Sequence, residues 1–172
     1  MNRPMWLVGC VALLAAAGVN AQNKISGTVK CNKPEPTYKL DVGDRPEHVM
    51  ELGKNTCTAV QPWEIGGDKY KEGYSVSISE TTSTRNMVIG NHVAMYESGD
   101  KAFAVFHKTT ALKNGKPAAD EPGTWSFTGG TGKLKGLKGK GTYKVTENSD
   151  ETVTVEVEGE YQLPTSKAAV KT

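Results

Sequence analysis

Residues Thr152–Tyr161 read TVTVEVEGEY and show the alternation that decides the fold class. Val153, Val155 and Val157 alternate there with polar Thr and Glu residues. Because successive side chains of a β-strand point to opposite faces, this pattern predicts a strand with one buried face and one wet face. The segment Tyr74–Ser79 (YSVSIS) alternates in the same way, and beyond residue 21 no long stretch shows a helical period.

Further alternating runs predict an antiparallel all-β domain. They cover Ile25–Lys30, Thr37–Val42, Thr56–Val60, Arg85–Tyr96, Lys101–Leu112, Gly123–Thr128 and Gly139–Thr146. The connectors Ser98-Gly99, Asn114-Gly115 and Asn148–Asp150 are short, which indicates consecutive hairpins. About eight strands in this order predict an up-and-down barrel, closed so that no edge stays unpaired; the alternative is a β-sandwich.

Turn lengths set the register of the strands and so decide which side chains share a face. A two-residue turn at Ser98-Gly99 places Val93 opposite Ala104. A two-residue turn at Asn114-Gly115 places Ala104 opposite Trp125. The core predicted from this register is Val93, Met95, Ala102, Ala104, Phe106, Trp125 and Phe127. The residues predicted to share the other face are His92, Ala94, Tyr96, Phe103, Val105, His107, Thr124 and Ser126.

The first residues, 1–21, read MNRPMWLVGCVALLAAAGVNA and predict a secretory signal peptide. Arg3 precedes an apolar run from Met5 to Val19, and small residues surround a cleavage site after Ala21. This run is shorter than the ~20 residues that a spanning helix needs. We therefore expect an exported protein, periplasmic or secreted. The alternative is a lipoprotein anchored through Cys10.

Cleavage after Ala21 leaves a single β-barrel domain over residues 22–163 and a flexible C-terminal tail over residues 164–172. It also leaves two cysteines, Cys31 and Cys57. Two cysteines in an oxidising compartment usually pair, so we predict a disulfide between them. Neither belongs to a CxxC motif, and no His lies at ligand spacing from either, so a metal site is not expected.

The charge of the chain is balanced: its 172 residues include 21 Lys+Arg and 19 Asp+Glu, which argues against a nucleic-acid-binding protein. The most basic stretch, residues 123–145 (GTWSFTGGTGKLKGLKGKGTYKV), fits neither Walker A nor GxGxxG spacing. A three-residue loop at 148–150 places Lys140 opposite Glu158 and Lys138 opposite Glu160, which cancels most of the local field. We expect no nucleic acid, no nucleotide and no cofactor. The glycines are expected at a tight barrel corner.

This block resembles the GTWxFTGGTGKxKGxKGxGTY stretch of secreted bacterial proteins of unassigned function. The resemblance extends over most of the mature chain, including Cys31, the Asp44-Arg45-Pro46 turn and Cys57. More distantly, Phe127–Gly141 is similar to the Gly-rich turn of the allene oxide cyclase and dirigent β-barrels. That similarity implies a calycin-like barrel, often trimeric, whose apolar lumen binds a small hydrophobic molecule. It implies no catalytic residue, because the acidic and polar lumen residues of those proteins have no match here.

The candidate ligand-binding residues are polar side chains of the predicted barrel: Tyr74, His92, His107 and Tyr143. His92 and His107 are predicted to be diagonal neighbours on one face, roughly 7–8 Å apart at the backbone. Two histidines without a third ligand make a poor metal site, so no metal is expected. A second polar cluster comprises Asp41, Asp44, Arg45, Glu47 and His48. It could support acid–base chemistry, but a solvated turn set by Gly43 and Pro46 is the preferred interpretation.

From the sequence we expect an exported, non-catalytic β-barrel that binds a small hydrophobic or amphipathic ligand. One alternative is an isomerase- or cyclase-like enzyme with its site in the lumen, for which no catalytic residue is assigned. Another is an envelope structural or assembly module that forms a homo-oligomer through an apolar outer face. An open lumen with convergent polar groups favours a carrier or an enzyme, whereas a lumen filled by Trp125 and Phe127 excludes both.

Overall fold

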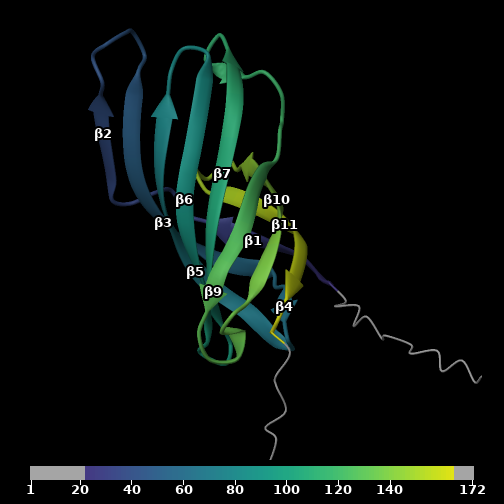
Figure 1. Cartoon of the computed structure of the whole chain (residues 1–172). Helices are drawn as coiled ribbons and strands as arrows, with labels where there is room; N and C mark the ends of the chain where they lie inside the picture. Colours follow the sequence, from purple (N-terminus) through teal and green to yellow (C-terminus); the bar gives the residue numbers. More distant parts are fainter. Residues whose placement is uncertain (1–21, 165–172) are drawn as a thin grey trace, which may run out of the picture.

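Eight strands close an antiparallel barrel in the computed structural model, which describes residues 22–164 (Figure 1). They are β1 (Asn23–Cys31), β3 (Val49–Gln61), β5 (Asp68–Thr81), β6 (Arg85–Tyr96), β7 (Lys101–Lys113), β9 (Gly123–Gly130), β10 (Lys138–Glu147) and β11 (Val153–Gln162). Each strand pairs with the next in this series, and β11 returns to β1. The prediction of an up-and-down barrel is confirmed.

Three short strands and one 3₁₀ turn add to this frame. β2 (Thr37–Asp41) pairs with β3, β4 (Glu64–Ile65) with β5, and β8 (Lys116–Pro117) with β7. The 3₁₀ turn η1 (Gly132–Leu134) lies between β9 and β10. Within residues 22–164 no helix has the length and apolarity to cross a membrane. The predicted signal with Cys10, and the predicted tail beyond Pro164, lie outside the described residues.

The β6–β7 turn is one residue longer than predicted, and this exchanges the two faces of β6. The Tyr96 amide donates to the Asp100 carbonyl oxygen (3.0 Å), and Ala94 pairs with Ala102. Side chains at even positions of β6 therefore point inward. The predicted core positions of Val93 and Met95 are wrong, as is the outer placement of His92, Ala94 and Tyr96. The other predicted core residues do face the interior: Ala102, Ala104, Phe106, Trp125 and Phe127.

The Asn114-Gly115 turn forms as predicted but joins different strands. Both residues have positive φ (53° and 73°), as a two-residue hairpin turn requires. The turn connects β7 to the short β8, and β9 begins later in the chain. Phe106 consequently pairs with Trp125, two residues away from the predicted register. A shift of two leaves each side chain on its predicted face.

The β10–β11 hairpin shows the same two-residue offset, because its loop spans residues 148–152. Lys140 pairs with Glu160 and Lys144 with Glu156, so the individual pairs differ from the prediction. The lysine and glutamate rows still face each other on the outer surface. The basic block is thus balanced by neighbouring carboxylates.

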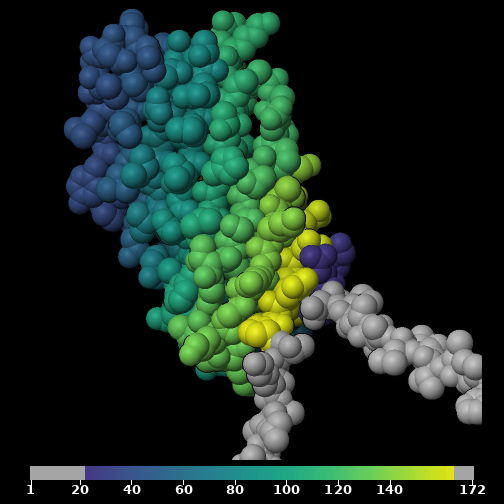
Figure 2. All heavy atoms as spheres, in the orientation of Figure 1, coloured from purple at the N-terminus to yellow at the C-terminus, as the bar shows by residue number. Residues whose placement is uncertain are grey.

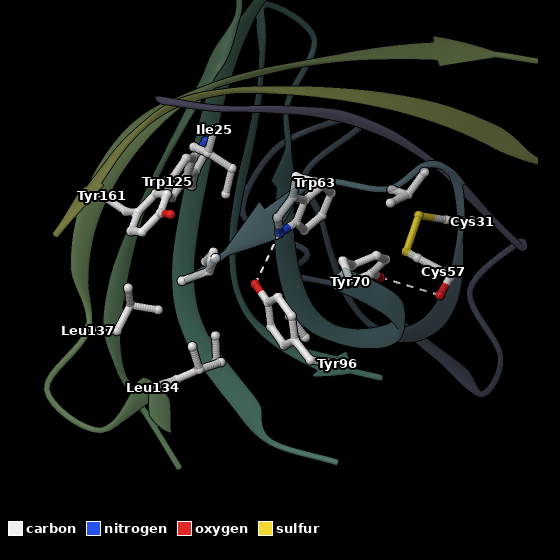
Figure 3. Packing of buried hydrophobic residues seen from close by; sticks show 14 residues of the cluster. Ile25, Cys31, Cys57, Trp63, Tyr70, Tyr96, Trp125, Leu134, Leu137 and Tyr161 are labelled. Carbon is white, nitrogen blue, oxygen red and sulfur yellow. Dashed lines mark hydrogen bonds between the residues drawn. A yellow bond between two sulfur atoms is a disulfide. The ribbon is translucent and has the colours of Figure 1, made fainter. Parts of the chain in front are cut away.

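One end of the barrel is filled by aromatic and aliphatic side chains (Figure 3). The ring of Trp63 stacks on Tyr70 with centroids 4.1 Å apart, and its Nε1–H donates to the Tyr96 hydroxyl (3.0 Å). Leu134 and Leu137, from the glycine and lysine block, are buried in the same cluster. The block therefore closes the barrel floor with its leucines, and its glycines supply the tight corner that was predicted.

The Trp125 ring lies against the backbone of neighbouring strands. A Cβ atom added at Gly141 or Gly159 would lie 2.7 Å or 2.6 Å from its Cζ2 atom. The indole Nε1–H donates to the carbonyl oxygens of Thr142 (3.1 Å) and Glu158 (3.2 Å). The two glycines therefore let a large ring lie close to the barrel wall.

The disulfide between Cys31 and Cys57 is present and joins β1 to β3. This ladder is short and contains a register shift between Thr28 and Val29. Both half-cystines are buried and line the barrel interior. The disulfide fits an exported location.

Replacing Cys31 and Cys57 by Ala should lower the free energy of unfolding by about 3.5 kcal/mol, because the bond constrains the unfolded chain over a sequence separation of 26 residues. Urea denaturation of the oxidised protein and of the double variant measures this difference. The wild type unfolded with a reductant is the control, and it should approach the variant. Equal stability of all three samples would contradict a stabilising bond.

Candidate ligand-binding lumen

Beyond the filled end, the barrel encloses a cavity of about 970 Å³. Part of its wall is apolar and comprises Ile25, Val29, Phe106, Trp125, Val145, Val153, Val155 and Val157. The part formed by β3, β5 and β6 carries Asn55, Ser75, Ser77, Thr81, Asn86 and His92. Exposed residues line the mouth, among them Pro117, Asp120 and Glu147. The cavity is therefore open and amphipathic, and the sequence-based concern that side chains fill it does not apply.

The four candidate residues from the sequence divide between the two sides of the wall. His92 and Tyr143 line the cavity. On the outer face, Tyr74 lies under the Lys54 ammonium (4.9 Å to the ring centroid) and His107 bonds the Thr124 hydroxyl (2.9 Å). The predicted grouping of His92 with His107 is wrong, because the longer β6–β7 turn rotates β6 by one residue relative to β7.

His92 is a half-buried hydrogen-bonding group in the polar wall. Its Nδ1 atom lies 2.8 Å from the Ser75 Oγ atom. Desolvation by burial lowers the pKa of His92 to about 4. The imidazole is therefore neutral at pH 7 and presents one donor and one acceptor.

Tyr143 on β10 pairs with Gly123 on the neighbouring strand β9, and its ring covers that glycine. A Cβ atom added at Gly123 would lie 2.2 Å from Tyr143 Cζ. The ring meets Phe106 edge-on, with centroids 5.9 Å apart. Burial raises the pKa of Tyr143 to about 12, so its hydroxyl stays protonated near neutral pH.

Lys108 is a lumen residue that the sequence reasoning missed. It belongs to the even-numbered inward row of β7 and is half-buried in the cavity wall. Within residues 22–164 no carboxylate lies within ion-pair distance of its ammonium group. The signal was present in the sequence, because the inward assignments of Ala104 and Phe106 place Lys108 on the same face.

The second polar cluster lies outside the cavity and ties the β2–β3 connection to β5. His48 Nδ1 lies 2.5 Å from Asp44 Oδ1, and His48 Nε2 lies 3.1 Å from Glu80 Oε1. The hydrogen bond with His48 is the main cause that lowers the pKa of Asp44 below its usual value. Arg45 contacts Asp44 at 3.3 Å. Across the described part of the chain, no three His, Cys, Asp or Glu side chains are grouped to hold a metal ion.

Comparisons with known proteins give a likeness of fold. No protein-family model matches the sequence, and no curated protein matches it. Among solved structures, a pyocyanin demethylase is 19% identical, with a TM-score of 0.42 over 77% of this chain and 98% of its own. One pterocarpan synthase dirigent protein is 12% identical, with a TM-score of 0.48 over 83% of this chain and 86% of its own. A second is 11% identical, with a TM-score of 0.50 over 83% of this chain and 96% of its own.

The fold similarity to the second dirigent protein agrees with the distant barrel resemblance drawn from Phe127–Gly141. At 11% identity it concerns the arrangement of strands. Any activity has to be argued from the lumen of this chain.

The partly desolvated imidazole of His92 makes stability depend on pH. The pKa of His92 is about 4 in the folded protein and that of an unfolded histidine is 6.5, so the unfolded state binds the proton first. Stability is therefore expected to fall as pH decreases from 6.5 to 4. His92→Asn should remove roughly 2–3 kcal/mol of that change. Urea denaturation at several pH values measures it, with His107→Asn as the outer-face control. A wild-type slope in His92→Asn would contradict a buried neutral imidazole.

Proposed function

We propose that this protein is an exported, non-catalytic β-barrel that binds one small amphipathic ligand in its lumen. The observation that carries the proposal is the open cavity of about 970 Å³, apolar along β1, β10 and β11 and polar along β5 and β6. Its size suits a small organic molecule, since ligand pockets typically measure roughly 300–1,000 Å³. An apolar body against the valines of β11 gains from leaving water, while a polar group is satisfied on the opposite wall.

The chemistry of the lumen supports binding over catalysis. With a pKa of about 4, His92 is a weak base at neutral pH. With a pKa of about 12, Tyr143 is a weak acid. Both groups suit hydrogen bonding to a ligand better than proton transfer. Of the four candidate residues from the sequence, His92 and Tyr143 are the two that an isomerase-like enzyme could use in the lumen, because Tyr74 and His107 face outward.

Export is part of the proposal. The Cys31–Cys57 disulfide supports an oxidising compartment, either the periplasm or the extracellular medium. The predicted signal at residues 1–21 supplies the route, with lipidation at Cys10 as the alternative.

Phenylnaphthylamine, a neutral probe whose fluorescence rises in apolar surroundings, should bind the purified protein. Ala104→Trp should weaken binding at least about tenfold, because Ala104 faces the cavity beside His92 and Phe127. Val105→Trp, on the outer face at the next position, is the control and should bind as the wild type does. Circular dichroism checks that both variants keep their strands. Equal binding by the two variants would place the probe outside the lumen and contradict the proposal.

A second candidate function is assembly into a homo-oligomer, favoured by apolar side chains on the outer face. The register aligns Tyr38, Leu52, Ile78 and Ile89 in one row across four strands, and these residues are 41–63% exposed. The blue-to-teal part of the surface in Figure 2 belongs largely to strands β2, β3, β5 and β6, which lie side by side. A second copy of the protein that covers this row would remove its apolar side chains from water, which favours association.

Native mass spectrometry should detect an oligomer, and Ile78→Asp should convert it to monomer. The Asp side chain would be buried without a partner in the contact. Val60→Asp is the control, since Val60 is exposed on β3 away from the row. A wild-type monomer at all concentrations tested would contradict this candidate.

A further inference from the structure

We infer that the lumen ligand carries a single anionic group and that Lys108 binds it. The inference rests on the proposed function and specifies the chemistry of its ligand. Among the described residues that line the cavity, Lys108 is the only Lys or Arg. The class of ligand that Lys108 can bind follows from its position in the cavity wall, the charges around it and the apolar side chains nearby.

Lys108 lies part-way between the filled end and the mouth. It pairs with Val88 on β6 and follows His107, whose pairing with Thr124 is the last of the β7–β9 ladder. Gly123, which opens β9, has no side chain, and the Tyr143 ring lies over it. Lys108 therefore lies at about the same level of the barrel as Val88 and Tyr143, which also line the cavity.

The ammonium lacks a counter-ion from the described protein. Asp120 and Glu147 are the carboxylates of the cavity lining, and both are exposed at the mouth. Neither lies within 4 Å of the Lys108 ammonium, since no such pair occurs among the ion pairs of residues 22–164. A half-buried cation gains most from a partner that brings the opposite charge into the cavity.

The surroundings restrict the form of the anion. The two mouth carboxylates repel a ligand with several negative charges, whereas a single carboxylate or sulfonate has less repulsion to overcome. Below the mouth, Val145, Val155 and Val157 offer an apolar surface for the rest of the molecule. The ligand class is therefore a monoanionic amphiphile with an aromatic or aliphatic body.

Two fluorescent probes separate this inference from the proposed function. Anilinonaphthalene sulfonate and phenylnaphthylamine share the same rings, and only the first carries an anionic group. Lys108→Met removes the charge and keeps a side chain of similar length. It should weaken binding of the sulfonate about tenfold, as expected for the loss of a charge-assisted contact, and change that of the neutral probe by less than about twofold.

Further variants test whether sulfonate binding depends on a positive charge at position 108 and takes place in the lumen. Lys108→Arg should keep tight sulfonate binding, and Lys108→Gln should lose it, which covers the case that Lys108→Met does not fold. Lys144→Met removes a lysine from the outer face of β10 and should leave both affinities unchanged. Ala104→Trp should block both probes if they occupy the lumen.

The outcomes distinguish the two proposals. Unchanged sulfonate affinity in Lys108→Met and Lys108→Gln, with the neutral probe still bound and still blocked by Ala104→Trp, would overturn the Lys108 inference and leave lumen binding intact. Failure of the wild type to bind either probe would overturn both. A selective loss of the sulfonate, together with its retention in Lys108→Arg, supports the inference.

Discussion

The contact of Trp125 with Gly141 and Gly159 is the constraint on which the open lumen depends. An eight-stranded barrel is narrow enough that ordinary inward side chains tend to fill it. Here the indole occupies the space that two side chains would take, and its Nε1–H is satisfied by backbone carbonyls of β10 and β11. The Tyr143 ring likewise occupies the space that a side chain at position 123 would take. Large rings thus line the wall while a cavity of about 970 Å³ remains beside them.

One wall of that cavity is polar because β5 turns its polar side chains inward and its apolar side chains outward. In β5, Ser75 and Ser77 point into the lumen, while Val76 and Ile78 are 38% and 46% exposed outside. A barrel strand usually places its apolar side chains in the core. The reversed facing of β5 makes one wall of the cavity polar. It also places Ile78 in the apolar row on the outer face. The proposed lumen binding and the proposed self-association therefore both involve β5, through alternate residues of that strand.

Local sequence rules were sufficient for the strands, the barrel and the disulfide, but they failed at a turn controlled from a distance. The turn after Tyr96 is held by Asp68, whose carboxylate accepts from the Ser98 amide (3.1 Å) and also from its hydroxyl. Asp68 belongs to another hairpin, so nothing within the Ser98-Gly99 dipeptide reveals the contact. The burial of Leu134 and Leu137 was missed for a similar reason, since they close the barrel only once distant strands meet.

The size of a register error decides its effect on a candidate site. The β7–β9 and β10–β11 pairings differ from prediction by two residues, so Trp125, Phe127 and Tyr143 kept their faces. The β6–β7 pairing differs by one, which moved His92 into the lumen and left His107 outside. Because side chains alternate with a period of two, only odd errors change which groups a ligand can reach. Lys108 shares the inward face of β7 with Ala104 and Phe106, so once that face is assigned the alternation within β7 places Lys108 in the lumen without a further turn.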